Sequence, residues 1–253
     1  YCACHRIITR QHQVAEPYLD ALEAELRLRA PRDGARRRVA QLHLGGGTPT
    51  FLTEAELLRL HRRLGEHYEL STGDEREYSI EIDPRTLRAE TIPLLASLGY
   101  NRLSLGVQDL TPAVQVAVNR IQPRELTQSA IEQARAHHLA VAVDLILGLP
   151  RQTPVSFATS LREIIALAPD RISLYSYAHL PQRFKAQRRL DAGQLPDAAS
   201  KLQLMQIAVD ALGAAGYLHI GMDHFARPGD ALAIAQRDGR LQRNFQGYST
   251  LGG

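Results

Sequence analysis

The fold is decided by the stretch Arg38-Val39-Ala40-Gln41-Leu42-His43-Leu44-Gly45-Gly46-Gly47-Thr48-Pro49-Thr50. Its apolar run, residues 39–44, predicts a buried strand that ends abruptly in three glycines. A helix should follow, because Thr53 and Glu56 form a capping-box pattern. This order places bare backbone amides at the carboxyl end of a strand, where parallel α/β folds bind ligands. The stretch lacks the marks of a phosphate loop or dinucleotide fingerprint, so a plain tight turn is the alternative.

The same alternation of strand and helix continues along the rest of the chain. Apolar runs predict further strands at residues 78–83, 102–107, 141–147, 171–177 and, more weakly, 217–222. Helices are predicted at residues 15–30, 53–66, 87–97, 124–138, 154–167 and 198–215, with a short one opened by Thr111-Pro112. Hairpin signals are missing, so we expect a parallel sheet with helices outside it. The number of units indicates an α/β barrel or partial barrel.

Composition excludes several classes of protein. The chain has 253 residues, enough for one large core or two small domains, and a net charge of +3. Only Lys185 and Lys201 are lysines, and the arginines are dispersed among glutamates, which indicates solvated helix faces rather than a nucleic-acid site. There is no apolar run of 18 residues and no signal-peptide pattern. We therefore expect a cytoplasmic protein, monomeric, without a nucleic-acid or membrane partner.

The two cysteines of the chain, Cys2 and Cys4, both lie within its first four residues. A disulfide between them is unfavourable at this spacing. A Cys-x-Cys pair at a chain start is instead what remains when a metal-binding loop is cut. Because the first residue is not Met, we interpret the sequence as a fragment.

Polar residues follow or interrupt the predicted strands. Glu81, Gln108, Asp144 and His179 are the main examples. A carboxylate within a buried strand is unfavourable unless it is paired, so Glu81 and Asp144 should have a partner, either a ligand or an arginine such as Arg120. No Ser-His-Asp pattern, suitably spaced carboxylate pair or HExxH is present, so a hydrolase is disfavoured. Carboxylate, amide and backbone N–H groups fit a zwitterionic cofactor that contains ribose.

Two histidine positions have open interpretations. His43 alternates with Leu42 and Leu44, which favours a position in the core or barrel lining over a metal ligand. Asp223-His224 fits an acid/base pair and a structural corner equally well.

Several motifs together resemble one family. They are Tyr-Cys-Ala-Cys at 1–4, Ile-Ile-Thr-Arg at 7–10, Gly-Gly-Gly-Thr-Pro-Thr at 45–50, Ile-Glu-Ile-Asp-Pro-Arg at 80–85, Arg-Leu-Ser-Leu-Gly-Val-Gln-Asp at 102–109, Val-Asn-Arg at 118–120, Asp-Leu-Ile-Leu-Gly-Leu-Pro at 144–150, Gly-Met-Asp-His-Phe-Ala-Arg-Pro at 221–228 and Arg-Asn-Phe-Gln-Gly-Tyr at 243–248. The resemblance is to the oxygen-independent coproporphyrinogen III oxidases, which are radical S-adenosylmethionine (SAM) enzymes. It covers the whole chain, and the last two motifs are the most specific.

The resemblance implies a partial (β/α)6 TIM-like barrel of the radical SAM type, with residues 1–253 as the core domain. It implies two cofactors, a [4Fe–4S] cluster and SAM, with two SAM molecules bound. The cluster would cleave SAM reductively to a 5′-deoxyadenosyl radical. That radical would initiate decarboxylation of two propionates of coproporphyrinogen III to vinyl groups, giving protoporphyrinogen IX. The implied partners are the porphyrinogen substrate and an unidentified electron donor.

The resemblance also assigns site residues. Gly46, Glu81 and Ala178 match contacts of the cluster-bound SAM. The contacts of the second SAM would be Tyr1, Gly47, Thr48, Gln108, Arg120 and Asp144. We expect Arg120 and Asp144 to lie within reach of one another or of one ligand.

The cysteines depart from the family pattern. That pattern is Cys-x3-Cys-x2-Cys-x-Cys; Cys2 matches its third cysteine, the last of three cluster ligands. Cys4 matches an additional cysteine that does not bind the cluster, and is our candidate catalytic residue. From the resemblance we expect that two cluster ligands, the first strand and the carboxyl-terminal helical domain lie outside the given sequence.

Two alternatives remain at this point. Haem chaperones share the radical SAM core but deliver haem, and an inactive fragment of the oxidase is the other possibility. Cys4, the Val-Asn-Arg-Ile-Gln stretch at 118–122 and the Gly-Met-Asp-His-Phe-Ala motif favour the oxidase, because chaperone-like members differ at all three.

Overall fold

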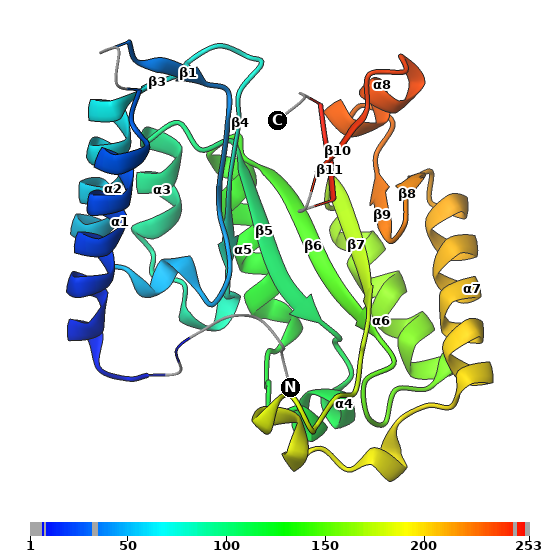
Figure 1. The fold of residues 1–253 in the computed structure, drawn as a ribbon. Helices are drawn as coiled ribbons and strands as arrows, with labels where there is room; N and C mark the ends of the chain where they lie inside the picture. The colour runs from blue at the N-terminus through cyan, green and yellow to red at the C-terminus, as the bar shows by residue number, and fades with distance from the viewer. Residues whose placement is uncertain (1–6, 8, 32–34, 245–246, 251–253) are drawn as a thin grey trace. The chain divides into compact units, whose positions relative to one another are not determined.

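A computed structural model describes residues 7, 9–31, 35–244 and 247–250 (Figure 1). Its helices are α1 (Ala15–Arg29), α2 (Glu54–His67), α3 (Thr91–Ser97), α4 (Pro112–Ala117), α5 (Arg124–Ala136), α6 (Pro154–Leu167), α7 (Ala198–Ala214) and α8 (Ala231–Arg237). Its strands are β1 (Arg37–Val39), β2 (Gln41–Leu44), β3 (Tyr68–Leu70), β4 (Glu77–Ile82), β5 (Arg102–Gln108), β6 (Ala140–Leu147), β7 (Arg171–Ser176), β8 (Leu218–Gly221), β9 (His224–Ala226), β10 (Gln242–Asn244) and β11 (Gly247–Ser249). The main sheet has the strand order β2-β4-β5-β6-β7-β9-β8.

The chain folds into two compact units. The amino-terminal unit holds the described residues up to Ser104 together with Glu132–Ala140. The carboxyl-terminal unit holds Leu105–Ile131 and the described residues from Val141 onward. Each unit contains parallel strand pairs, β2 with β4 in the first and β6 with β7 in the second. The prediction of an α/β fold with parallel strands is therefore confirmed.

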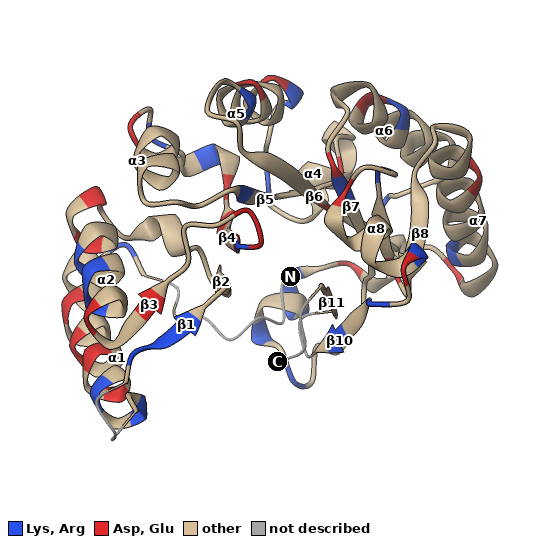
Figure 2. Ribbon diagram, turned by 90° about the horizontal axis from the view of Figure 1, so that it is seen from above, with Lys and Arg blue, Asp and Glu red and all other residues tan. Residues whose placement is uncertain are grey.

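In the amino-terminal unit, helices α1 and α2 lie side by side (Figure 1). Figure 2 shows acidic and basic residues interspersed along both helices. Arg59 on α2 illustrates the pattern, since its guanidinium contacts Glu16, Asp20 and Glu23 of α1 at 2.5–2.6 Å. The hydrogen bond from Arg59 to Glu23 lowers the pKa of the Glu23 carboxyl below its ordinary value, against the opposing effect of burial. The arginines here pair with acids on helix faces, as the sequence predicted.

Helix α2 begins with the predicted capping box. The Thr53 hydroxyl accepts the N–H of Glu56 at 3.3 Å, and the Glu56 carboxylate accepts the N–H of Thr53 at 2.7 Å. Thr53→Ala should therefore lower the free energy of unfolding by about 1 kcal/mol. The matched control is Thr72→Ala, an exposed threonine outside any helix, which should change it by less than about 0.5 kcal/mol. Urea denaturation of both variants tests this, and equal losses would contradict the capping role.

Three predictions of local structure were wrong. The apolar run 39–44 is divided by a bend at Ala40 into β1 and β2, which pair with different strands. The helix predicted at 87–97 begins only at Thr91. The weak strand predicted at 217–222 is present as β8, but the expectation of a sheet without hairpins was wrong, because β8 and β9 pair antiparallel and β9 also pairs antiparallel with β7. Met222, in the turn, has a φ of +49°, an uncommon conformation for a residue of its kind.

In the carboxyl-terminal unit, helices α6 and α7 pack against one another, and β7 is buried along its middle and exposed at its carboxyl end. Ile172 and Leu174 are fully buried, whereas Tyr175 on the opposite face is 40% exposed. The exposed side chains of β7 therefore lie at its carboxyl end, where Tyr175 and Ser176 are open to solvent. No helix in the described part of the chain is long and apolar enough to cross a membrane.

Candidate functional site

The glycine turn after β2 is closed by a carboxylate from β4. The backbone N–H of Gly46 donates to Oε2 of Glu81 at 3.0 Å. Gly46 and Gly47 have φ values of +75° and +58°, which favour glycine. At Gly45 a Cβ would lie 2.5 Å from Nε2 of His43 and 2.8 Å from Oε1 of Glu81, whereas at Gly46 it would meet nothing within 4 Å. The turn therefore brings backbone and carboxylate together and leaves open space above Gly46.

Strand register places His43 and Glu81 on the same face of the strand pair. His43 pairs with Ser79, and Ser79 and Glu81 are two residues apart on β4. Nδ1 of His43 lies 2.7 Å from the Ser79 hydroxyl, and Nε2 lies 3.6 Å from Oε1 of Glu81. The Glu81 side chain is 42% exposed. The premise that Glu81 is a buried charge was wrong, because much of its side chain is open to solvent; in its own unit, the imidazole of His43 lies beside it.

A second set of predicted residues lies in the carboxyl-terminal unit. Gln108 ends β5, Arg120 follows α4, Asp144 lies on β6 and Ala178 follows β7. Nη2 of Arg120 donates to the carbonyl of Gly106 at 2.6 Å. A Cβ at Gly106 would lie 3.1 Å from Nε2 of Gln108 and 3.4 Å from Nη2 of Arg120. The structure thus brings Gln108 and Arg120 together over Gly106. The expected proximity of Arg120 to Asp144 stays a prediction.

The segment that carries Ala178 is fixed by a buried glutamine that the sequence gave no reason to select. Gln187 is 1% exposed, and its Nε2 donates to the carbonyl of Ala178 at 3.0 Å. Its Oε1 accepts the N–H of Leu180 at 2.6 Å. Beside it, the Tyr177 hydroxyl lies 3.1 Å from Nδ1 of His179, and burial raises the pKa of that phenol. Gln187 lies in a short 3₁₀ helix, Lys185–Arg189, whose sequence shows no periodic apolar pattern, so sequence alone gave no reason to select it.

Asp223 and His224 form a packed corner. Nδ1 of His224 lies 2.8 Å from Oδ1 of Asp223, although at an angle unsuited to a strong hydrogen bond. Burial tends to raise the pKa of Asp223, but the contact with His224 outweighs it and leaves that pKa below its ordinary value. The imidazole stands edge-on between Tyr175 and Tyr248, at centroid distances of 6.2 and 5.6 Å. Of the two interpretations, enclosure by aromatic rings favours the structural corner.

In this corner the motifs at 221–228 and 243–248 pack against one another, and a glycine of each lies at the contact. At Gly221, with φ +148°, a Cβ would lie 2.1 Å from the Tyr248 hydroxyl, and at Gly247 it would lie 2.9 Å from Nε2 of His224. Gly221→Ala should therefore lower the melting temperature by several degrees, because a new methyl group would force the Tyr248 ring aside. The control is Gly229→Ala, where a Cβ would meet nothing. An equal or smaller loss in Gly221→Ala, measured by thermal denaturation, would contradict this packing.

The predicted residues Tyr1, Cys2 and Cys4 lie outside the described part of the chain. Within the described part, no group of three or more His, Cys, Asp or Glu residues could hold a metal ion.

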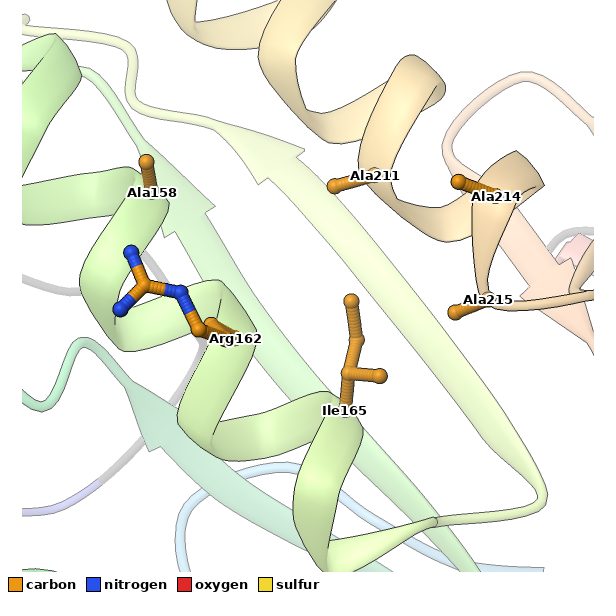
Figure 3. A pocket seen from close by; sticks show the side chains of 6 residues that line it. All are labelled: Ala158, Arg162, Ile165, Ala211, Ala214 and Ala215. Atoms are coloured by element: carbon orange, nitrogen blue, oxygen red, sulfur yellow. The ribbon is translucent and has the colours of Figure 1, made fainter.

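Figure 3 shows a groove between α6 and α7 lined by Ala158, Arg162, Ile165, Ala211, Ala214 and Ala215. Four alanines, one isoleucine and one arginine provide no acid, nucleophile or metal ligand. The groove is therefore not the candidate site.

Comparisons with known proteins agree with the resemblance. The model of a family described as the Radical SAM superfamily matches residues 1–164. The oxygen-independent coproporphyrinogen III oxidases of Pseudomonas aeruginosa and Escherichia coli are 50% and 48% identical over all 253 residues, and each match covers 55% of the relative. The structure of coproporphyrinogen III oxidase from E. coli, described as a radical SAM enzyme, superposes with a TM-score of 0.95 at 48% identity, covering 99% of this chain and 57% of that one. The chain spans about half the length of these relatives.

Proposed function

Because the chain belongs to the radical SAM superfamily, we propose that it forms the core domain of an anaerobic coproporphyrinogen III oxidase. The proposed reaction is decarboxylation of two propionates of coproporphyrinogen III to vinyl groups. Each propionate would lose a hydrogen atom to the 5′-deoxyadenosyl radical, release carbon dioxide, and pass one electron to a final electron acceptor. Further parts of the proposal are two bound SAM molecules, an electron donor, a monomeric state and a cytoplasmic location.

The contact between Gly46 and Glu81 is the observation that carries the proposal. A backbone turn with two positive φ angles, open space above Gly46 and a half-exposed carboxylate at its edge fit a ligand with amino and hydroxyl groups. When bound, the [4Fe–4S] cluster and SAM supply a 5′-deoxyadenosyl radical, which abstracts hydrogen from the substrate. Glu81 and Gly46 would orient SAM, and the backbone of Ala178, held by Gln187, would contact the same molecule.

The remaining site residues have proposed roles in a second SAM site. Gln108 and Arg120 converge over Gly106 and can bind a carboxylate with charge-assisted hydrogen bonds. Asp144, Gly47, Thr48 and Tyr1 complete the proposed set. Cys2 is proposed as a cluster ligand, and Cys4 as a cysteine that acts without binding the cluster.

The test uses an extended chain, defined here as this sequence preceded by residues that complete the family's Cys-x3-Cys-x2-Cys-x-Cys segment. After anaerobic reconstitution, the extended chain should convert coproporphyrinogen III to protoporphyrinogen IX and form 5′-deoxyadenosine. Mass spectrometry of both products measures this. Formation of 5′-deoxyadenosine with no decarboxylated porphyrinogen would contradict the oxidase assignment while leaving the superfamily membership intact. Transfer of haem to an acceptor protein, without decarboxylation, would instead support the chaperone alternative.

A further inference from the structure

The chain leaves β5 through a strained turn. Gln108, the last residue of β5, has a φ of +74°. The N–H of Asp109 donates to the carbonyl of Val107 at 3.0 Å, two residues back. A bond of this span with positive φ at its central residue defines the rarer, strained form of γ-turn. A glutamine side chain does not favour a positive φ, so the surrounding structure must impose this conformation on Gln108.

The residue that follows Gln108 in the turn, Asp109, is held by hydrogen bonds to its buried carboxylate. Asp109 is 2% exposed. Its Oδ1 accepts the N–H of Thr111 at 2.6 Å and the hydroxyl of Ser160 at 3.1 Å. Its Oδ2 accepts Nε2–H of Gln152 at 2.7 Å. A buried carboxylate with these neutral donors is strongly held in place, because losing any donor leaves a charged acceptor unsatisfied.

The donors are themselves fixed to neighbouring segments. Gln152 accepts the N–H of Gly148 at 2.6 Å and donates to the carbonyl of Ile146 at 2.9 Å. Gln115, which is 6% exposed, donates to the carbonyl of Asp109 at 3.0 Å. We name the residues Asp109, Gln115, Gln152 and Ser160 the Asp109 cluster. It connects the end of β5 with α4 and with the segment between β6 and α6.

The Asp109 cluster also contacts the segment that carries Arg120. The N–H of Arg120 donates to the carbonyl of Gln115 at 2.8 Å. The Gln115 amide in addition bonds both backbone groups of Gln122, at 2.8 and 2.9 Å. One cluster therefore anchors the backbone next to Gln108 and the backbone of Arg120. Their side chains meet over Gly106, whose missing Cβ leaves room for both.

We propose that the Asp109 cluster is a positioning device that holds Gln108 and Arg120 in the geometry required to bind the carboxylate group of a zwitterionic ligand. The inference rests on the proposed role of Gln108 and Arg120 in the second SAM site. Asp109 does not touch the ligand in this scheme. It acts through the strained turn and through Gln115, so its loss should change ligand affinity as well as stability.

The strain is tested separately from binding. Gln108→Gly should raise the melting temperature of the chain by about 2–4 °C, because glycine adopts positive φ without strain. The matched control is Ala168→Gly at the end of α6, where φ is +57°. Both variants should gain stability, but only Gln108→Gly should lose the second SAM. A lower melting temperature in Gln108→Gly, alongside a gain in Ala168→Gly, would overturn the claim of strain.

The positioning role is tested in the reconstituted extended chain by equilibrium dialysis with labelled SAM. Asp109→Asn should weaken the second SAM equivalent at least about tenfold and leave the first equivalent bound. If Asp109→Asn does not fold, Ser160→Ala, which removes a single donor, should weaken the second equivalent by a smaller factor.

The outcomes separate the two proposals. If Gln108→Ala leaves the second equivalent unchanged, Gln108 is not a SAM contact and the proposed site is wrong, and the positioning role fails with it. If Gln108→Ala weakens the second equivalent but Asp109→Asn and Ser160→Ala do not, only the positioning role is overturned. A variant of Asp109 that is less stable yet binds two SAM molecules with unchanged affinity would also overturn the positioning role, because a purely structural role predicts that result.

Discussion

Cys2→Ala in the extended chain should abolish the [4Fe–4S] cluster. In the proposed site three thiolates bind three irons and leave the fourth iron to SAM, so Cys2→Ala removes one of the three protein ligands of the cluster. Cys2 matches the last of these three ligands by its place in the motif. Iron and sulfide analysis after anaerobic reconstitution should give four of each per chain before the substitution and almost none after it, with loss of the brown colour.

Cys4→Ala is the matched control for this substitution. This variant also loses one thiol, two residues further along the chain. It should keep the full iron and sulfide content, because Cys4 matches a cysteine that does not bind the cluster. The present sequence, with Cys2 and Cys4 as its two cysteines, should remain colourless under the same treatment. A complete cluster in Cys2→Ala, or its loss in Cys4→Ala, would show that the ligand assignment is reversed.

Elements with strong local signals were predictable from sequence. The capping box at Thr53 and the helix predicted at 154–167 both formed as expected, because Thr53 and Thr153 each satisfy backbone N–H groups within one turn of helix. Gly99 likewise follows α3 with a φ of +86°, as a helix terminator should. These features depend only on residues that are neighbours in sequence.

Features that depend on distant partners were missed. The bend at Ala40 exists because β1 and β2 pair with different strands, and nothing within residues 39–44 encodes that difference. The β8–β9 hairpin turns at Met222-Asp223 without the usual Asn-Gly or Asp-Gly, and is supported instead by contacts between its glycine and Tyr248. Sequence reasoning had no means to see this contact across 27 residues.

The same distinction between local and distant partners applies to the residues of the candidate site. The glycine turn and Glu81 could be selected as neighbours, because parallel strands bring their carboxyl ends to one edge of a sheet. The Asp109 cluster could not, since Gln115, Gln152 and Ser160 are ordinary polar residues until folding buries them around one carboxylate. The positive φ of Gln108 is equally invisible in sequence, because the residue type gives no warning of it.

Glu81→Gln in the extended chain should weaken binding of the cluster-bound SAM roughly 10- to 100-fold. A hydrogen bond to a charged group contributes about 1.5–3 kcal/mol, and the substitution removes the charge while keeping the shape. The amide oxygen of glutamine can still accept the N–H of Gly46, so the turn should persist and the melting temperature should change little. The loss should therefore appear in affinity rather than in stability.

Glu69→Gln provides the matched control, because Glu69 is an exposed glutamate on β3 of the same unit. It changes net charge by the same amount and should leave SAM affinity unaltered. Calorimetric titration of SAM into both reconstituted variants measures the difference directly. Equal affinities for the two variants would remove Glu81 from the site. A large fall in melting temperature for Glu81→Gln alone would show instead that its carboxylate serves mainly to close the glycine turn beside His43.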